Sequence, residues 1–207
     1  MEERKRKGNA LLHGSRNDGG RLGGNMTDAE SYLAIAGIDT GITRALERMG
    51  YFTQPASKSH HLACEGGLAT HSANVTRRLV ELTKALDMKW CRTEQAPYVV
   101  GMMHDLVKCR CYKMKGREAE GRPEWEYVQP EYPGHGACSV MIAAELGIFL
   151  YADEIAAITY HMGTFGIGKE YTEKEFEAAM KRFAPQIIAT HTADWWAARV
   201  DEEGLSV

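Results

Sequence analysis

The sequence predicts an all-α fold, a helical bundle of about seven helices with one short β-hairpin inserted near residues 110–130. Two observations carry this prediction. Apolar residues recur at helical spacing along most of the chain, and helix-start signals such as Thr27 with Glu30 precede them. By contrast, residues 109–134 alternate large apolar residues with lysines and contain turn glycines, which indicates a short hairpin.

The length and charge of the chain suit one ordinary domain. It has 207 residues and a net charge of −3, so it can bury a core and does not resemble a polyanion-binding protein. We expect residues 1–25, which hold a basic run and a glycine-rich stretch, to be a disordered tail and residues 26–207 to form a single domain. Contact of the tail with nucleic acid is the alternative to a solvated tail.

Targeting signals are not evident. No apolar run approaches the ~20 residues of a membrane span, and the basic N-terminus lacks the apolar stretch of a secretory signal. The five cysteines are an odd number without the spacing of a disulfide framework. We therefore expect a cytoplasmic protein with reduced thiols and no membrane partner, whose oligomeric state stays open.

The first half of the chain predicts four helices. One begins at Thr27, a second spans Gly41 to Met49, and a third runs from Gly66 to Leu86 along an apolar stripe. Pro97 opens the fourth in a first-turn position, and we expect that helix to carry the adjacent residues His104 and Asp105.

The second half predicts the remaining helices. Residues 134–146 form one, and Asp153 is expected to cap the next, in which Ile155, Ile158 and His161 recur three residues apart. An amphipathic helix follows over Thr172 to Phe183, and Pro185 opens the last one. The face of this last helix that we expect to point inward carries Ile187, His191, Asp194 and Trp195.

Metal-binding residue types fall inside or beside these helical stretches. Any one of the histidines alone is better interpreted as a core residue with one hydrogen bond. Buried carboxylates, however, are rare unless they are paired or coordinate a metal, and a shared ion would satisfy all of these groups at once. The predicted cluster consists of His71, His104, Asp105, His135, His161 and Asp194.

The order and spacing of part of this set resemble a known family. His71, the doublet His104-Asp105 and Asp194 match the H…HD…D signature of the HD superfamily of metal-dependent phosphohydrolases, over about residues 50–200. The ordered set within helical segments is specific, whereas an isolated His-Asp dipeptide is not. Some members hold two metals and supply extra histidines between the doublet and the last aspartate, as His135 and His161 do here.

Two further segments narrow the resemblance. Lys108 completes the HDxxK pattern that some members carry. The segment Pro55-Ala56-Ser57-Lys58-Ser59-His60-His61, followed by Glu65-Gly66-Gly67-Leu68, is similar to the HD domain of bacterial 3′→5′ exoribonucleases and of related domains carried with relaxases. The OB-type nucleic-acid-binding domain of those exonucleases is not expected here.

The resemblance implies a metal-dependent phosphohydrolase that cleaves a phosphomonoester or phosphodiester of a nucleotide-like substrate. In such a site Asp105 bridges two ions, a metal-bound hydroxide attacks phosphorus, and Lys108 contacts the phosphate. Mixed imidazole and carboxylate ligands suit one or two divalent ions of Mn, Fe, Co, Ni or Zn. The implied ligands are His71, His104 and Asp194 on one ion, with His135 and His161 on the other.

Other polar and aromatic residues near the ligands have two interpretations each. Lys58, His60 and His61 precede the first ligand helix and are candidates for substrate contacts, the alternative being a surface loop that orients the helix. His191 lies one turn before Asp194 and is expected to support the site rather than to bind the ion. The adjacent Trp195 and Trp196 are interpreted as packing residues rather than base-stacking platforms.

Two other functions stay open at this point. One is a 3′→5′ exonuclease acting on single-stranded RNA or DNA, which the segment ahead of His71 and the basic tail favour. The other is a non-catalytic HD signalling or scaffold module, although such modules usually lose ligands. The expected partner is accordingly a phosphorylated small molecule or a nucleic-acid end.

Overall fold

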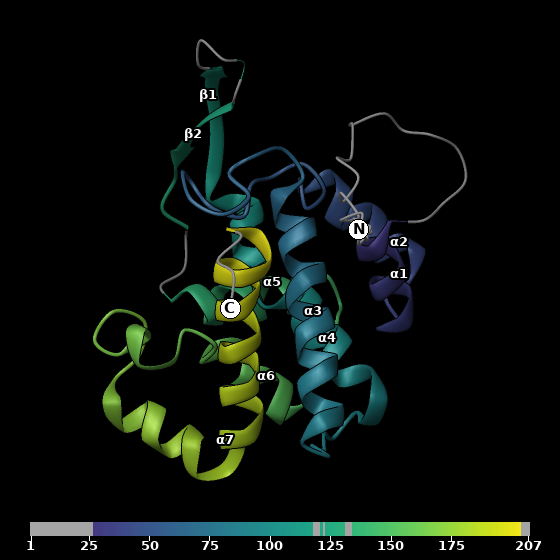
Figure 1. Cartoon of the computed structure of the whole chain (residues 1–207), viewed down its shortest axis with the longest axis vertical. Helices are drawn as coiled ribbons and strands as arrows, with labels where there is room; N and C mark the ends of the chain where they lie inside the picture. Colours follow the sequence, from purple (N-terminus) through teal and green to yellow (C-terminus); the bar gives the residue numbers. More distant parts are fainter. Residues whose placement is uncertain (1–26, 118–120, 122, 131–133, 204–207) are drawn as a thin grey trace, which may run out of the picture.

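The computed structural model describes residues 27–117, 121, 123–130 and 134–203, so the predicted tail over residues 1–25 lies outside it. The described part of the chain forms seven α-helices and one antiparallel hairpin, which confirms the predicted helical fold with a single hairpin (Figure 1). The helices are α1 (Asp28–Ile35), α2 (Thr40–Arg48), α3 (Gly67–Ala85), α4 (Ala96–Met103), α5 (His135–Glu145), α6 (Ala152–Thr159) and α7 (Glu173–Trp196).

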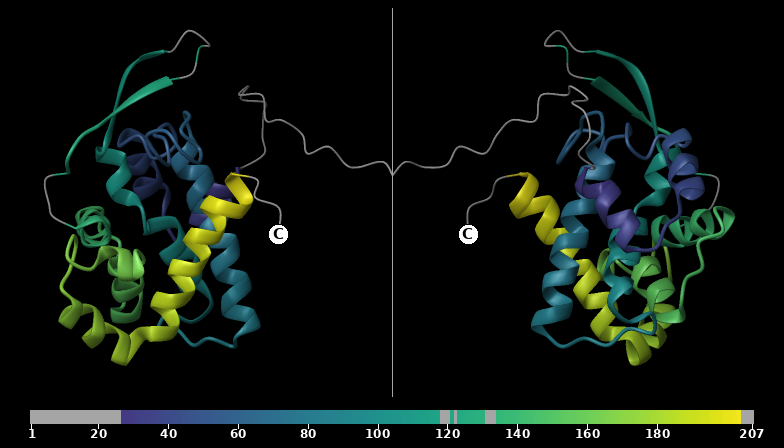
Figure 2. Two further views of the ribbon diagram at one scale, coloured as in Figure 1. Left: turned by 60° about the vertical axis from the view of Figure 1, so that its left-hand side comes forward. Right: turned by 90° about the vertical axis from the view of Figure 1, so that its right-hand side faces the viewer.

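The helices pack around α3 and the part of α7 that follows Pro185, here called the second part of α7. These two stand side by side in Figures 1 and 2. α3 packs against α4 and α7, while α6 lies between α5 and α7. Leu68, Val75 and Leu79 of α3 are fully buried, as the apolar stripe predicted. None of the helices in the described part combines the length and hydropathy that crossing a bilayer requires.

Two helices begin with a reciprocal capping pair, one of them the predicted pair of Thr27 and Glu30. At α1 the Thr27 side chain accepts the N–H of Glu30, and the Glu30 carboxylate accepts the N–H of Thr27 at 2.8 Å. Thr172 and Glu175 form the same reciprocal pair at the start of α7.

The predicted cap of α6 is wrong. Tyr151 is its first flanking residue, whereas Asp153 lies inside the first turn and accepts the backbone N–H of Cys91 at 2.7 Å. The helix begins before Asp153, so this carboxylate binds a distant part of the chain instead of capping α6. α6 also ends at Thr159, so His161 lies in the turn beyond it rather than on its face.

The chain changes direction at the His104-Asp105 doublet. His104 caps the C-terminal end of α4, and Asp105 leaves helical geometry with φ −112° and ψ 20°. A short 3-10 helix, Leu106–Arg110, follows. Adjacent side chains on an α-helix point in widely different directions. Because the doublet lies in this turn and not within a regular helix, the side chains of His104 and Asp105 can point toward the same place.

The hairpin consists of β1 (Tyr112–Arg117) and β2 (Pro123–Tyr127) and projects from the helical body (Figure 2). Met114 pairs with Trp125, whose side chain is buried where the hairpin leaves the body. The Arg117 guanidinium reaches back to Glu65 at 2.6 Å.

α7 is bent near the proline that was predicted to open a helix. Phe183 has non-helical angles (φ −131°, ψ 22°) two residues before Pro185, because a proline ring clashes with the preceding turn. Figure 1 shows the change of direction between the two parts of α7. Beyond Trp196 the helix continues as a π-helical segment, Ala197–Glu202, which shifts the side-chain register of its last turn.

A close crossing of α3 and α4 generates the first testable prediction. A Cβ atom at Gly101 would lie 2.4 Å from Oγ1 and 2.6 Å from Cα of Thr76, so only glycine permits this approach. We expect Gly101→Ala to lower the free energy of unfolding by about 1–3 kcal/mol through overpacking, measured by urea denaturation. Gly116→Ala is the control, since its Cβ would meet no atom within 4 Å, and an equal loss in both variants would contradict the assignment.

Candidate metal centre

The structure brings all six predicted metal ligands into one cluster. They arrive from five parts of the fold: α3, the end of α4 with the turn after it, the start of α5, the turn after α6, and the second part of α7. Four of the six residues are at most 2% exposed. The six are His71, His104, Asp105, His135, His161 and Asp194.

Asp105 lies at the centre, and its two oxygens divide the cluster into two halves. Oδ1 is 2.5 Å from Nε2 of His135 and 3.8 Å from Nε2 of His161. Oδ2 is 3.3 Å from Nε2 of His104 and 3.5 Å from Nε2 of His71. In each half, the imidazole nitrogens and the carboxylate oxygen lie within 4.8 Å of one another, a spacing that can hold a metal ion.

Asp194 closes the more buried half. Its Oδ1 is 3.1 Å from Nε2 of His71 and 3.9 Å from Nε2 of His104. Asp194 also groups with His104 and His161 within 4.8 Å. Asp194, which comes from α7, therefore faces the same space as Asp105.

The ring orientations fit metal coordination. Nδ1 of His104 lies 2.8 Å from the carbonyl oxygen of Gly101, and Nδ1 of His161 lies 2.7 Å from that of Ile158. A carbonyl oxygen only accepts, so these Nδ1 atoms carry the proton and each Nε2 presents a lone pair to the cluster.

The buried nitrogens of the cluster face its carboxylates. Nε2 of His71 and Nε2 of His104 are both fully buried, and the nearest oxygens are those of Asp194, 3.1 Å from His71, and of Asp105, 3.3 Å from His104. Burying such polar and charged groups is costly unless they are paired or bind a metal. The donor set of imidazole nitrogens and carboxylate oxygens therefore fits a metal ion.

Lys108 places a positive charge against the central carboxylate. Its Nζ lies 2.6 Å from Oδ2 of Asp105. Burial lowers the pKa of Lys108, but the charges of Asp105 and Asp194 outweigh burial and raise it, so the ammonium is protonated. Burial likewise raises the pKa of Asp105, yet Lys108 and His104 hold it well below its usual range. Asp105 is thus an anion despite its burial.

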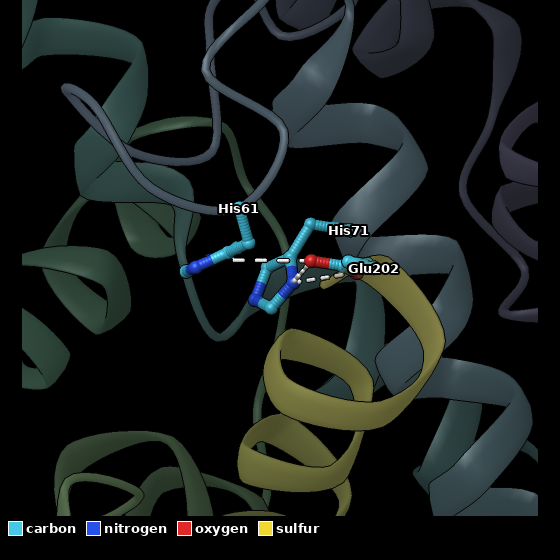
Figure 3. A group of neighbouring side chains, drawn as sticks. All are labelled: His61, His71 and Glu202. Atoms are coloured by element: carbon cyan, nitrogen blue, oxygen red, sulfur yellow. Dashed lines mark hydrogen bonds and ion pairs between the residues drawn. The ribbon is translucent and has the colours of Figure 1, made fainter. Parts of the chain in front are cut away.

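Glu202 is a site residue that the sequence analysis missed. It comes from the π-helical segment after α7, and its two carboxylate oxygens lie 3.0 and 3.1 Å from Nδ1 of His71 (Figure 3). The Asn74 amide donates to the same carboxylate at 3.0 Å. A carboxylate behind an imidazole fixes its orientation and makes it a stronger ligand. Glu202 therefore orients His71 toward the cluster.

The end of the π-helical segment is anchored to α3. The Asp201 carboxylate accepts from the guanidinium of Arg77 at 3.0 Å and from Nε of Arg78 at 2.9 Å. These pairs hold Glu202 against His71. The shifted register of a π-helix is not visible in side-chain periodicity, so no spacing signal pointed to Glu202.

The histidines of the preceding loop differ in their placement. His61 is largely buried, and its Nε2 lies 4.0 Å from Glu202 beside His71 (Figure 3). Burial, with the nearby charge of His71, lowers the pKa of His61 to about 4, so its ring is neutral. His60 is exposed at the cavity rim, whereas Lys58 is exposed and does not line the cavity.

His191 supports the cluster without joining it. Its Nδ1 donates to the backbone carbonyl oxygen of His161 at 2.7 Å. This contact holds the turn that carries His161, in line with the supporting role expected from the sequence.

An open cavity of about 320 Å³ leads to the cluster. Its floor contains Asp105, Lys108, His161 and Asp194, and α7 supplies one wall with Trp195. A larger cavity of about 460 Å³ lies between the C-terminal end of α3 and the bend of α7, but no histidine lines it. Of these two cavities, the one above the cluster reaches the residues that could hold a metal ion.

The two tryptophans at the end of α7 have different surroundings. The guanidinium of Arg78 lies over the Trp196 ring at 5.5 Å from its centre, as expected of a surface packing residue. Trp195, however, is 59% exposed and lines the cavity. The contact with Arg78 agrees with the packing interpretation of Trp196, while the interpretation of Trp195 stays a prediction.

Comparison with known protein families, curated proteins and solved structures found no match to this chain. The class of the protein is accordingly defined by its own geometry, as a helical protein with a buried histidine and aspartate cluster that can hold metal.

The surroundings of His71 predict a metal-dependent titration. Burial lowers its pKa, but the contacts with Asp194 and Glu202 outweigh burial and raise it to about 9 in the metal-free protein. Protons therefore compete with the ion, and metal affinity should increase as the pH rises toward 9. In NMR spectra of the protein with labelled histidine, we expect the ring of His71 to titrate near pH 9 in the metal-free protein. When metal is bound, the same ring should not titrate. His71→Asn identifies its signal, and a midpoint below 7 would contradict this prediction.

The contact between Glu202 and His71 predicts a loss of metal affinity. We expect Glu202→Ala to weaken binding of a divalent ion about 10–100-fold, measured by competition with a chromogenic chelator. Glu202→Gln should retain more affinity, because its amide oxygen still accepts from Nδ1 of His71. Glu145→Ala, a change of an exposed carboxylate on α5, is the matched control. Unchanged affinity in Glu202→Ala would exclude the orienting role.

Proposed function

We propose that this chain is an HD-type phosphohydrolase that uses one or two divalent metal ions to cleave a phosphate ester of a nucleotide-like substrate. One observation carries the proposal. Four imidazole groups and two carboxylates converge beneath an open cavity, and the ammonium of Lys108, which lines this cavity, lies beside the central carboxylate. The order of these residues also matches the H…HD…D pattern.

The ligands divide between two positions. His71, His104 and Asp194 would hold one ion together with Oδ2 of Asp105. His135 and His161 would hold the other with Oδ1. When bound, such ions act as Lewis acids and lower the pKa of water, so that a nucleophile is available near neutral pH.

The side chains of the site act on the phosphate in defined ways. Lys108 is protonated and therefore donates a hydrogen bond to a phosphoryl oxygen rather than acting as a base. Asp105 is an anion that keeps the positive groups in place. Because carbonyl oxygens and Glu202 already orient the imidazoles, little reorganisation is needed as charge develops on the phosphoryl oxygens.

The reaction balances as a simple hydrolysis. The oxygen of water forms a bond to phosphorus while the bond between phosphorus and the leaving oxygen breaks. One proton of the water ends on the departing alcohol, and inorganic or esterified phosphate remains. No oxidant or reductant takes part.

The burial of the cluster favours an enzyme over a scaffold module. A protein-binding module has no use for a cluster of buried imidazole and carboxylate groups, since burying such groups costs free energy. Such a cluster beneath an open cavity is instead what metal-assisted chemistry requires.

The experiment compares substrates and variants. Purified protein, loaded in turn with Mn, Fe, Co, Ni or Zn, is incubated with nucleoside monophosphates, a phosphodiester and oligonucleotides labelled at the 5′ end. We expect hydrolysis that a chelator abolishes. Lys108→Gln should lower kcat about 10²–10³-fold, because it removes a charged donor to the phosphoryl group. Asp87→Asn, at a carboxylate that is 86% exposed, is the control.

Other outcomes discriminate against the proposal. A protein that retains no ion and hydrolyses none of these esters would overturn it. Oligonucleotides shortened from the 3′ end, with inert mononucleotides, would instead support the exonuclease.

A further inference from the structure

The wall that α7 contributes to the cavity is formed by residues on one helical face. Trp195 follows Asp194 directly, and Ala198 and Arg199 lie three and four residues further on. All four line the cavity. The indole of Trp195 therefore stands beside the place where a phosphate would lie over Asp105 and Lys108.

More than half of the Trp195 side chain is exposed. No aromatic or cationic group of the described residues is seen to pack on its ring, whereas the guanidinium of Arg78 lies over Trp196. An exposed indole in a cavity is an apolar surface that a ligand can cover, with a geometry that favours flat rings. The small, buried side chain of Ala198 leaves space next to it.

Met162 adds a second apolar group to the cavity. It comes from the turn after α6, next to His161, and is partly buried. A thioether makes favourable contacts with aromatic rings. Trp195 and Met162 thus supply the kind of lining that an aromatic ring prefers.

We infer, on the basis of the proposed function, that the substrate carries a flat aromatic ring, such as a nucleobase, which stacks on Trp195 while its phosphate lies over Asp105 and Lys108. Stacking on an aromatic side chain is tolerant of the particular base, so Trp195 selects for a ring rather than for one nucleobase.

The size and charge of the cavity favour a single nucleotide over a nucleic-acid strand. A volume of about 320 Å³ is at the lower end of the range of small-molecule sites. Arg199, a cation that lines the cavity, is already paired with Glu203 at 3.0 Å, and the Glu203 carboxylate lines the cavity as well. A polyanionic strand would find little compensating charge there.

A pair of matched esters tests the inference. Benzyl phosphate and cyclohexylmethyl phosphate have similar leaving groups and differ in whether the ring is flat. We expect the metal-loaded protein to prefer benzyl phosphate about tenfold in kcat/KM, mainly through KM, and Trp195→Leu to abolish this preference. Trp195→Phe should retain most of it, and Trp196→Leu is the matched control.

A binding measurement separates this inference from the proposed function. Phenylphosphonate and cyclohexylphosphonate, which are not hydrolysed, are titrated into the metal-loaded protein by calorimetry. Tighter binding of the phenyl compound, lost in Trp195→Leu but kept in Trp196→Leu, supports the inference even if no ester is cleaved. Equal binding of the two compounds, or a preference that survives Trp195→Leu, overturns it, while ester hydrolysis can still stand.

Discussion

The structure depends on keeping one carboxylate, that of Asp105, ionised in the middle of a helical core. A buried charge is tolerated only with partners, and Asp105 has one at each oxygen: His135 at 2.5 Å and Lys108 at 2.6 Å. These partners require the helices to approach closely. Gly101 lets α4 meet α3, and Gly136 lets α5 meet the end of α6, where a Cβ would lie 2.3 Å from the Ile158 carbonyl oxygen. The close helix crossings therefore serve to bring the groups of the polar cluster together.

α7 contributes residues both to the metal-binding cluster and to the wall of the cavity. Its second part supplies the ligand Asp194 and, directly after it, the exposed wall residue Trp195. The π-helical segment that follows then turns Glu202 onto His71. The pairing of Asp201 with Arg78 of α3 holds the end of this helix. A shift in the register of the helix would displace Asp194, Trp195 and Glu202 together.

Local patterns allowed much of this to be predicted from the sequence. The capping pair Thr27 and Glu30 and the apolar stripe of α3 depend on residues three or four apart, so they are readable without tertiary structure. The prediction for Asp153 was wrong because its donor, the N–H of Cys91, is distant in the chain. Glu202 was missed for a similar reason, since a π-helical register carries no periodic signal.

The two halves of the cluster differ in their burial. His71 and His104 are fully buried, and their Nε2 atoms face the carboxylates of Asp105 and Asp194 inside the core. His135 is 24% exposed at the cavity and already contacts Asp105. An ion in the buried half would satisfy core nitrogens and so stabilise the fold as well as the site. The half with His135 instead opens to the cavity, where an incoming phosphate would meet the positive charge of Lys108.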